Sequence, residues 1–303
     1  MFRIRIQNKK KCIWYCSAVV SFLLFLLLLG WTNHLANTQD AQQMAGRWSE
    51  KKDVAQISCF FSSKAEVTED TIQSFEYSLK NVLQEASITE TSENPSARLW
   101  VDAYSADGKI TLVNGKNTLD ANAIGIGGDF FMFHPLKLIT GAYFSGNDLM
   151  QDYCIIDQDA AWQLFGSNDV VGMTVYIGNV PHIVTGVVQR PDSRMDKAAG
   201  LNSTVVYVSY ETLSAYGTNN GINHYEIVMP NPVDEFAYGK VKEGIGIDEK
   251  NVEIVENSRR YSLPNRIKTI LAFGTRSMNG KAIIYPYWEN LARGYEDIIA
   301  LLT

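Results

Sequence analysis

The sequence predicts an α+β protein, in which one N-terminal transmembrane helix is followed by a two-lobed extracytoplasmic domain. The first observation is that residues 12–31 form an apolar run without a charged side chain. The second is that β-prone segments alternate with amphipathic helical segments after this run. The third is that two stretches of β-α-β character flank residues 121–190. We therefore expect a discontinuous β-α-β lobe with a smaller α/β lobe inserted in it.

The apolar run is long enough to cross a membrane. Its twenty residues, Cys12–Trp31, match a hydrocarbon core of about 30 Å at a rise of about 1.5 Å per residue. Aromatic residues that suit the headgroup level lie at both ends, Trp14 and Tyr15 before and Trp31 after. The residues ahead of the run include five basic ones and no acid, which predicts an N-terminus in the cytoplasm and the bulk of the chain outside.

A cleaved signal peptide is the alternative interpretation of this run. The apolar core of a signal peptide is usually about 7–15 residues long and ends in a small-x-small cleavage site. The run here is longer, and the sequence WTNHLANTQD that follows contains no Ala-x-Ala. These two differences favour an uncleaved anchor in the cell membrane, and both interpretations export most of the chain.

Composition describes an ordinary globular protein with an acidic exported part. Of 303 residues, 46% are hydrophobic and 20% charged, which argues against disorder. The chain has 27 basic and 33 acidic residues; subtracting the five N-terminal basic ones leaves 22 against 33, or −11. This charge argues against nucleic acid as a partner. Outside the span, Cys59 and Cys154 lie in apolar, strand-like runs, which favours buried free thiols over a disulfide.

The helices and strands of the first lobe are predicted from the spacing of their apolar residues and from helix-capping residues. No proline lies between Thr32 and Ser49, so we expect the membrane helix to continue as a stalk until Gly46. A strand, Val54–Phe61, precedes a helix that Thr68 caps. We expect another strand at 97–104, and a turn at Asp107-Gly108 that leads into a strand at 109–113.

The inserted lobe contains a glycine cluster that does not fit a phosphate-binding loop. Gly125, Gly127 and Gly128 lack the G-x-G-x-x-G spacing and a following Lys-Ser/Thr, so we expect a bend beside a packed aromatic group. Further along, Asp157 is placed to cap a helix over 158–165. A hairpin is predicted about Gly178-Asn179, a two-residue turn type that suits twisted strands.

A second α/β stretch returns to the first lobe. It has predicted strands at 204–208, 224–229 and 251–255, a helix after the cap Ser209, and a helix that Asn231-Pro232 opens and Gly244 ends. The predicted organisation is a cytoplasmic N-terminus (1–11), a transmembrane helix (12–31), a helical stalk (32–52), the first lobe (53–120 and 201–257), the inserted lobe (121–200) and a membrane-proximal return segment (258–303).

The return segment is rich in basic residues. In an acidic exported part, such a cluster is suited to anionic lipid headgroups, and a solvated basic face is the equally weighted alternative. The residues concerned are Arg259, Arg260, Arg266, Lys268 and Arg276.

The middle of the chain resembles the MacB-like periplasmic core domain of ABC-transporter permeases, the MacB/FtsX-type family. The stretches that carry this resemblance are IGIGGDFFMFHPLKLITGAYFSG, IIDQDAAWQLFG and VVGMTVYIGNVPHIVTGVV, in this order after a membrane span. The resemblance implies that the first lobe is similar to efflux-pump porter domains. Family permeases continue into further membrane helices, whereas this chain stops at Thr303 before a second one. It is therefore expected to be one piece of a split permease or a shortened product.

The resemblance also implies a function without enzymatic chemistry in this chain. ATP hydrolysis is expected in a separate ABC ATPase subunit, since no G-x-x-x-x-G-K-Ser/Thr occurs here. Further permease subunits, membrane lipid and a membrane-fusion adaptor are the other implied partners. Two alternatives remain: an FtsX-like signalling module that activates a cell-wall hydrolase, and a membrane-anchored ligand-binding protein. No catalytic, cofactor or metal site is expected, since the four histidines are far apart in the sequence.

Overall fold

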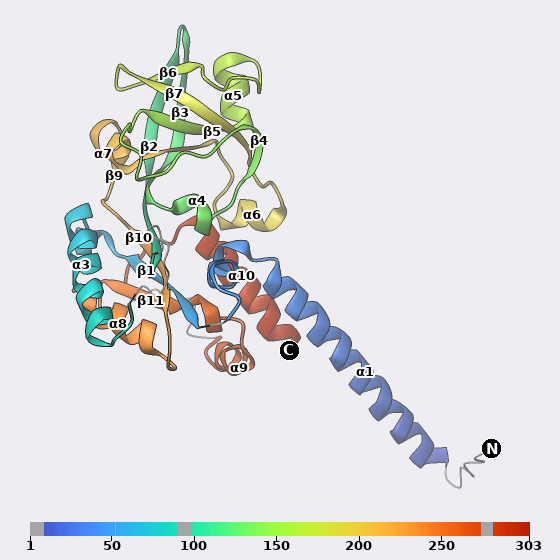
Figure 1. The fold of residues 1–303 in the computed structure, drawn as a ribbon. Helices are drawn as coiled ribbons and strands as arrows, with labels where there is room; N and C mark the ends of the chain where they lie inside the picture. Colours follow the sequence, from blue (N-terminus) through green and yellow to red (C-terminus); the bar gives the residue numbers. More distant parts are fainter. Residues whose placement is uncertain (1–8, 52, 90–97, 274–280) are drawn as a thin grey trace.

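The computed structural model describes residues 9–51, 53–89, 98–273 and 281–303. Helix α1 (Lys9–Asn37) projects from a body of two lobes, with α10 (Tyr287–Leu302) beside its base (Figure 1). A single mixed sheet of eleven strands runs through both lobes. The predicted fold class, an α+β protein with one N-terminal apolar helix, is confirmed.

The first lobe is built on four antiparallel strands in the order β11-β1-β10-β2. Helices α3 (Glu69–Glu85) and α8 (Phe236–Gly244) pack on one face of this sheet and enclose an apolar core. The Thr68 cap is confirmed as a capping box with Thr71. The strands are β1 (Val54–Phe61), β2 (Val101–Asn114), β10 (His224–Pro230) and β11 (Val252–Glu256); a short 3-10 turn, η2 (Ser63–Ala65), follows β1.

Strand β2 runs straight through the position where we expected a turn. Asp107 and Gly108 lie in the middle of β2, paired with β3 (Asn117–Gly128), and the turn comes at Gly115 with its positive φ of 60°. The prediction of a turn at Asp107-Gly108 is therefore wrong. Gly108 has another role, because a Cβ there would lie 2.3 Å from the carbonyl oxygen of Thr218 in the short strand β9 (Thr218–Asn219), which pairs antiparallel with β2.

The inserted lobe continues the same sheet in the order β3-β8-β5-β7-β4, with β6 paired to β7 and β2. Three predicted features are confirmed: Asp157 and Ser209 cap their helices, and the β6–β7 hairpin turns at Gly178-Asn179. The strands are β4 (Lys137–Gly141), β5 (Tyr153–Asp157), β6 (Thr174–Ile177), β7 (Val180–Gln189), β8 (Val205–Ser209) and β9 (Thr218–Asn219); the helices are α4 (Phe130–Phe133), α5 (Gln158–Phe165), α6 (Arg194–Ala199) and α7 (Tyr210–Tyr216).

The chain returns to the first lobe later than predicted. We placed the boundary at residue 201, but β8 pairs in parallel with β3 and antiparallel with β5. Its side chains Val206 and Val208 belong to the apolar core of the inserted lobe. The return comes at β10, which pairs with β1 and β2. The backbone pairing of β8 with β3 assigns β8 to the inserted lobe. Capping signals in the sequence do not show which strands pair, so they could not place this boundary.

The helix after the membrane span ends earlier than predicted. Helix α1 stops at Asn37, and a short linker replaces the expected continuous stalk: η1 (Asp40–Gln42) and α2 (Met44–Trp48). Polar side chains satisfy carbonyl groups of the last turn, since Thr38 donates to the carbonyl of Leu35 and Gln43 to that of Ala36. These side chains allow the backbone to leave the helix without a glycine.

The C-terminal segment contains η3 (Asn257–Arg259), α9 (Leu263–Leu271) and α10. Helix α8 starts at Phe236, later than the start predicted from Asn231-Pro232. The side-chain oxygen of Asn231 still accepts a hydrogen bond from the backbone N–H of Ala237 in the first turn of this helix. Part of the predicted 97–104 strand and the basic residue Arg276 lie outside the described residues.

Glycine and cysteine positions agree with the sequence analysis. The ring of Tyr104 fills the space beside Gly127, where a Cβ would lie 2.0 Å from a ring carbon. The packed aromatic ring that we predicted is present, but Gly125 and Gly127 lie within strand β3, and of the three glycines only Gly128, at the end of the strand, has a positive φ, of 65°. Cys59 and Cys154 are buried, free thiols, and burial raises the pKa of Cys154 to about 12.

Candidate functional site

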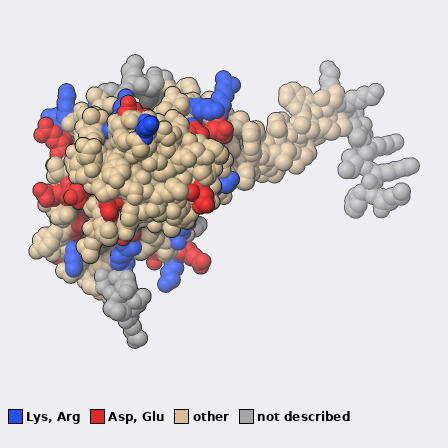
Figure 2. All heavy atoms as spheres, turned by 90° about the horizontal axis from the view of Figure 1, so that it is seen from above, with Lys and Arg blue, Asp and Glu red and all other residues tan. Residues whose placement is uncertain are grey.

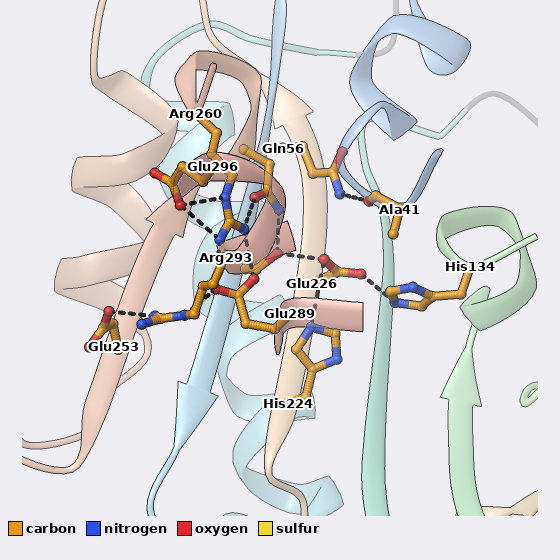
Figure 3. Close-up of polar contacts among 12 residues, drawn as sticks. Ala41, Gln56, His134, His224, Glu226, Glu253, Arg260, Glu289, Arg293 and Glu296 are labelled. Carbon is orange, nitrogen blue, oxygen red and sulfur yellow. Dashed lines mark hydrogen bonds and ion pairs between the residues drawn. The ribbon is translucent and has the colours of Figure 1, made fainter. Parts of the chain in front are cut away.

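The candidate functional site is a set of polar side chains, all buried except the partly exposed Arg293, at the place where the linker, α10 and both lobes meet. We call it the junction network; it comprises Gln56, Ser58, His134, His224, Glu226, Asn257, Arg260, Glu289 and Arg293, most of them drawn in Figure 3. It lies beside an apolar cluster that contains Phe130, Tyr207 and Trp288 from different elements. Most protein cores are apolar. A concentration of buried polar groups at one place therefore indicates a specific role.

The linker after α1 is bonded to both lobes. The side chain of Gln56 on β1 accepts from the backbone N–H of Met44 at 2.9 Å and donates to the carbonyl of Ala41 at 2.7 Å (Figure 3). The guanidinium of Arg47 on α2 donates to the carbonyl of Met132 on α4 at 2.7 Å. The linker that follows α1 is therefore tied to the first lobe through Gln56 and to the inserted lobe through Arg47.

Arg266 on α9 joins the base of α1 to the end of α10. Its guanidinium donates to Thr32 at 3.1 Å, to Asn33 at 2.7 Å and to Thr303 at 3.3 Å. The side chain is buried, with a further bond to the carbonyl of Tyr261 at 2.8 Å. These acceptors are uncharged oxygens, so these contacts are hydrogen bonds and not ion pairs. They connect the Arg266 cation to three parts of the chain.

A buried ion-pair network fixes α10 to the sheet. Arg260, 3% exposed, forms a bidentate pair with Glu289 at 2.7 and 2.8 Å (Figure 3). Arg293 lies against the same carboxylate at 2.7 Å and reaches Glu253 on β11 at 2.8 Å. Burial alone would raise the pKa of Glu289, but the two guanidinium groups outweigh it and hold this pKa below its usual range.

Glu226 connects this network to the inserted lobe. Asn257 accepts from Arg260 at 3.2 Å and donates to Ser58 at 2.7 Å, and the Ser58 hydroxyl donates to Glu226 at 2.5 Å. The other carboxylate oxygen of Glu226 lies 2.8 Å from Nε2 of His134, which follows α4 (Figure 3). A continuous polar path thus runs from α10 through η3, β1 and β10 to the inserted lobe.

Two histidines face the Glu226 carboxylate in an environment without solvent. Burial lowers the pKa of His134, and the charges of His224 and Arg47 lower it further while Glu226 opposes them. Burial alone would raise the pKa of Glu226, but the facing imidazoles keep it below its usual range. The indole of Trp288 covers this group, with its ring centroid 4.3 Å from that of His134 and 5.2 Å from that of His224.

The same three side chains are also the candidate metal ligands of the described part of the chain. One ligand atom each from His134, His224 and Glu226 lies within 4.8 Å of the others. Two ligands of a tetrahedral zinc ion, each about 2.0–2.1 Å from the metal, are roughly 3.3 Å apart. The contact of 2.8 Å between His134 and Glu226 is shorter than that. The arrangement fits a direct contact between imidazole and carboxylate better than coordination.

We expect the stability of the protein to fall in mild acid through His134. An unfolded histidine takes up a proton near pH 6.5, whereas the lowered pKa of His134 delays this step in the folded state. As pH falls below about 6.5, the unfolded chain binds more protons, so the free energy of unfolding decreases. The His134→Gln variant should show a shallower decrease in urea titrations between pH 7.5 and 5.5. The variant His34→Gln, at an exposed position of α1, is the control; equal slopes in all three proteins would contradict the prediction.

The structure separates the residues that the sequence analysis grouped in the tail. Arg259 and Lys268 are at the surface, with Arg259 paired to Asp234 at 2.5 Å. Arg260 and Arg266 are buried in the contacts described above, so their guanidinium groups do not face lipid. The aromatic residues proposed to anchor α1 are exposed: Trp14, Tyr15 and Trp31.

Sequence reasoning did not identify the junction network. Its members come from β1, β10, η3, α4 and α10, and only the fold brings them together. One signal was present: in the strand 224–229, His224 and Glu226 alternate with Tyr225 and Ile227, so two polar residues face one side of a buried strand. Buried polar side chains of this kind require hydrogen-bonding or charged groups opposite them, and the sequence does not show which residues provide these groups.

Comparison with known proteins assigns most of the chain to one family. Residues 21–254 match the model of the MacB-like periplasmic core domain. The chain belongs to this family. Among the described residues, helix α1 is the apolar helix long enough to cross a membrane. It begins ahead of the matched region and extends into it. This chain is therefore a membrane-associated member with a MacB-like periplasmic domain.

Individual relatives match a smaller part of the chain. A 99-residue stretch is 32% identical to the macrolide export ATP-binding/permease protein MacB of Chromobacterium violaceum, which is 32% of this chain and 15% of that protein. The protein of the same name from Pasteurella multocida is 30% identical over 98 residues, or 32% of this chain and 14% of that protein. The chain thus matches about one seventh of the length of these relatives.

Two solved structures are similar in outline. The periplasmic region of MacB from Actinobacillus actinomycetemcomitans has a TM-score of 0.44 at 20% identity and covers 71% of this chain and 92% of that one. The extracellular domain of the noncanonic ABC-type transporter YknZ from Gram-positive bacteria has a TM-score of 0.42 at 18% identity, with 66% and 99% covered.

Proposed function

We propose that this chain is the extracytoplasmic domain and first membrane helix of an ABC-transporter permease of the MacB/FtsX type. In this proposal the N-terminus is in the cytoplasm, and a separate ATPase subunit hydrolyses ATP. The membrane helix carries the resulting movement to the two lobes, which perform export or mechanical work outside the membrane. Membership of the MacB-like periplasmic core family supports the placement, and the relatives named MacB combine ATP-binding and permease parts in one protein.

The observation that supports coupling most is the attachment of α1 to both lobes. At its base, α1 is bonded through Arg266 to α10, and the following linker is bonded to β1 and to α4. Because α1 and the linker are held by hydrogen bonds, two of them buried, rather than by a loose loop, we expect a tilt of α1 to be transmitted to the body. The projecting helix is uncharged along most of its length in Figure 2, as a helix in lipid must be.

Movement of one lobe against the other is the measurable consequence. Spin labels at Lys80→Cys on α3 and Lys116→Cys at the β2–β3 turn report the distance between the lobes, in a background in which Cys12 and Cys16 are serine. The full chain would be measured in membranes of its own host, with ADP and then with ATP and vanadate. We expect the distance distribution to differ between the two states.

A pair within one lobe serves as the matched control. The far end of β2 pairs with β6, so the turn that contains Lys116 belongs to the inserted lobe, as does Glu211 on α7. Lys116→Cys with Glu211→Cys, both exposed, should therefore give the same distances in both nucleotide states. If the pair between the lobes is equally unchanged while the membranes hydrolyse ATP, coupling to an ATPase is excluded for this chain.

A further inference from the structure

Helix α9 has its polar and apolar faces reversed relative to a helix on the surface of a soluble protein. Its side chains Arg266 and Thr269 turn toward the body and are buried. Its large apolar side chains turn outward and are exposed: Leu263 by 53%, Ile267 by 56%, Ile270 by 43% and Leu271 by 82%.

The spacing of these four residues places them on one side of the helix. They stand at positions i, i+4, i+7 and i+8, the pattern of a single stripe along an α-helix. Phe273, two residues past the last of them, is 48% exposed as well. Exposed apolar residues are common singly, but a continuous stripe of this kind marks an interaction surface.

The position of α9 along α1 identifies what covers this stripe. Arg266 bonds to Thr32 and Asn33, the first two residues after the apolar run that ends at Trp31. If α1 crosses the bilayer with this run in the hydrocarbon core, Thr32 lies at the outer headgroup level. Helix α9 is held at the same level by two hydrogen bonds. Figure 1 shows α9 at the side of the body from which α1 projects.

We propose that α9 is an interfacial helix that inserts its outward stripe, Leu263, Ile267, Ile270 and Leu271, into the outer surface of the lipid bilayer. Lys268 is exposed at the flank of this stripe, where its long side chain reaches from the apolar surface toward the phosphate groups. The contact fixes the distance and tilt of the body relative to the membrane, because Arg266 ties α9 to α1 and to the end of α10. This proposal requires that α1 spans the membrane, but it does not require an ATPase.

The environment of single positions in the full chain tests this proposal. Fluorescent NBD labels at Ile267→Cys and at Leu271→Cys would be compared with a label at Tyr77→Cys, an exposed position on α3, in vesicles of phosphatidylethanolamine and phosphatidylglycerol. Cys12 and Cys16 would be serine. We expect the two α9 labels to emit at shorter wavelength and to be quenched by lipid that carries a doxyl group near the headgroup. The label at position 77 should do neither.

A label within α1 separates failure of this proposal from failure of the anchor. Phe25→Cys should be quenched by lipid with a doxyl group deep in the acyl chain. If it is, and the α9 labels remain solvent-like and unquenched, the interfacial helix is excluded while the anchor stands. If the α9 labels are shielded but not quenched by doxyl lipid, and become exposed on dilution into excess lipid, a second copy of the chain covers the stripe and the proposal is equally excluded.

Substitution of the stripe adds a second readout. With the label at Leu263→Cys, the pair of changes Ile267→Ser and Leu271→Ser should abolish quenching, whereas Lys268→Gln should retain it. Because all of these side chains are exposed in the folded protein, the thermal unfolding temperature in detergent should remain unchanged, which excludes misfolding as the cause.

Discussion

Replacement of Glu289 by alanine is expected to destabilise the folded protein by about 3–5 kcal/mol, the cost of breaking a buried ion pair by removing one partner. The change leaves the buried guanidinium of Arg260 without its bidentate carboxylate, so that its ion pair with a Glu296 oxygen at 3.2 Å remains, and it leaves Arg293 without one of its two partners. Its magnitude would be measured as the free energy of unfolding in urea, with the full chain in detergent micelles and tryptophan fluorescence as the signal. A loss of this size would show that the Glu289 carboxylate contributes to the attachment of α10 to the sheet, beside the pairs Arg260–Glu296 and Arg293–Glu253.

A surface ion pair of the same chemistry provides the control. Asp234→Ala removes the nearest of three carboxylates that pair with Arg259, whose side chain is 39% exposed, and should cost no more than about 1 kcal/mol. A double-mutant cycle between Arg260 and Glu289 should give a coupling free energy of roughly 0.5–3 kcal/mol. If Glu289→Ala costs as little as the control, the buried network does not contribute as described.

Replacement of Glu226 by alanine is expected to have a comparable effect, again about 3–5 kcal/mol, because it removes a buried charged group that is bonded on both sides. Ser58 would lose its acceptor, and His134 and His224 would lose the carboxylate that faces them. The carboxylate joins β10 to α4, so the loss affects the contact between the lobes. Urea unfolding of the full chain measures it.

Glu243→Ala is the matched control for this change. Its side chain, 73% exposed on α8, has only a surface pair with Lys240, so its loss should change stability within about 0.5 kcal/mol. The conservative variant Glu226→Gln keeps the shape and removes the charge; it should lie between wild type and Glu226→Ala. Equal stability of Glu226→Ala and Glu243→Ala would refute the assigned role of the carboxylate.

The fold was predictable where local chemistry decides it. The caps Asp157 and Ser209 and the turn Gly178-Asn179 act within a few residues of themselves, and each is found where the sequence placed it. Asp107-Gly108 has the same local chemistry but lies inside β2, because Asp107 bonds to Asn223 and Gly108 pairs antiparallel with the neighbouring strand β9. A tertiary contact overrides the turn preference there.

The junction network could not be predicted for a related reason. Arg260 and Arg266 have the composition of a surface cluster that binds anions, and sequence cannot show that Glu289 lies opposite one and Thr32 opposite the other. Similarly, α9 is amphipathic by sequence, but which face turns outward depends on the position of α1 and α10. The spacing of apolar residues and the composition indicate that a helix has an apolar face and a polar face. Contacts between elements distant in the sequence determine which face packs against the body.

The central claim is that α1 crosses the membrane with the N-terminus inside and both lobes outside. The most direct test labels single cysteines in intact cells with a maleimide that does not cross membranes, in the background with Cys12 and Cys16 replaced by serine. We expect Lys116→Cys, exposed at the β2–β3 turn, to be labelled in intact cells, and Gln7→Cys to be labelled only after permeabilisation. Labelling of Lys116→Cys only after permeabilisation would contradict the claim.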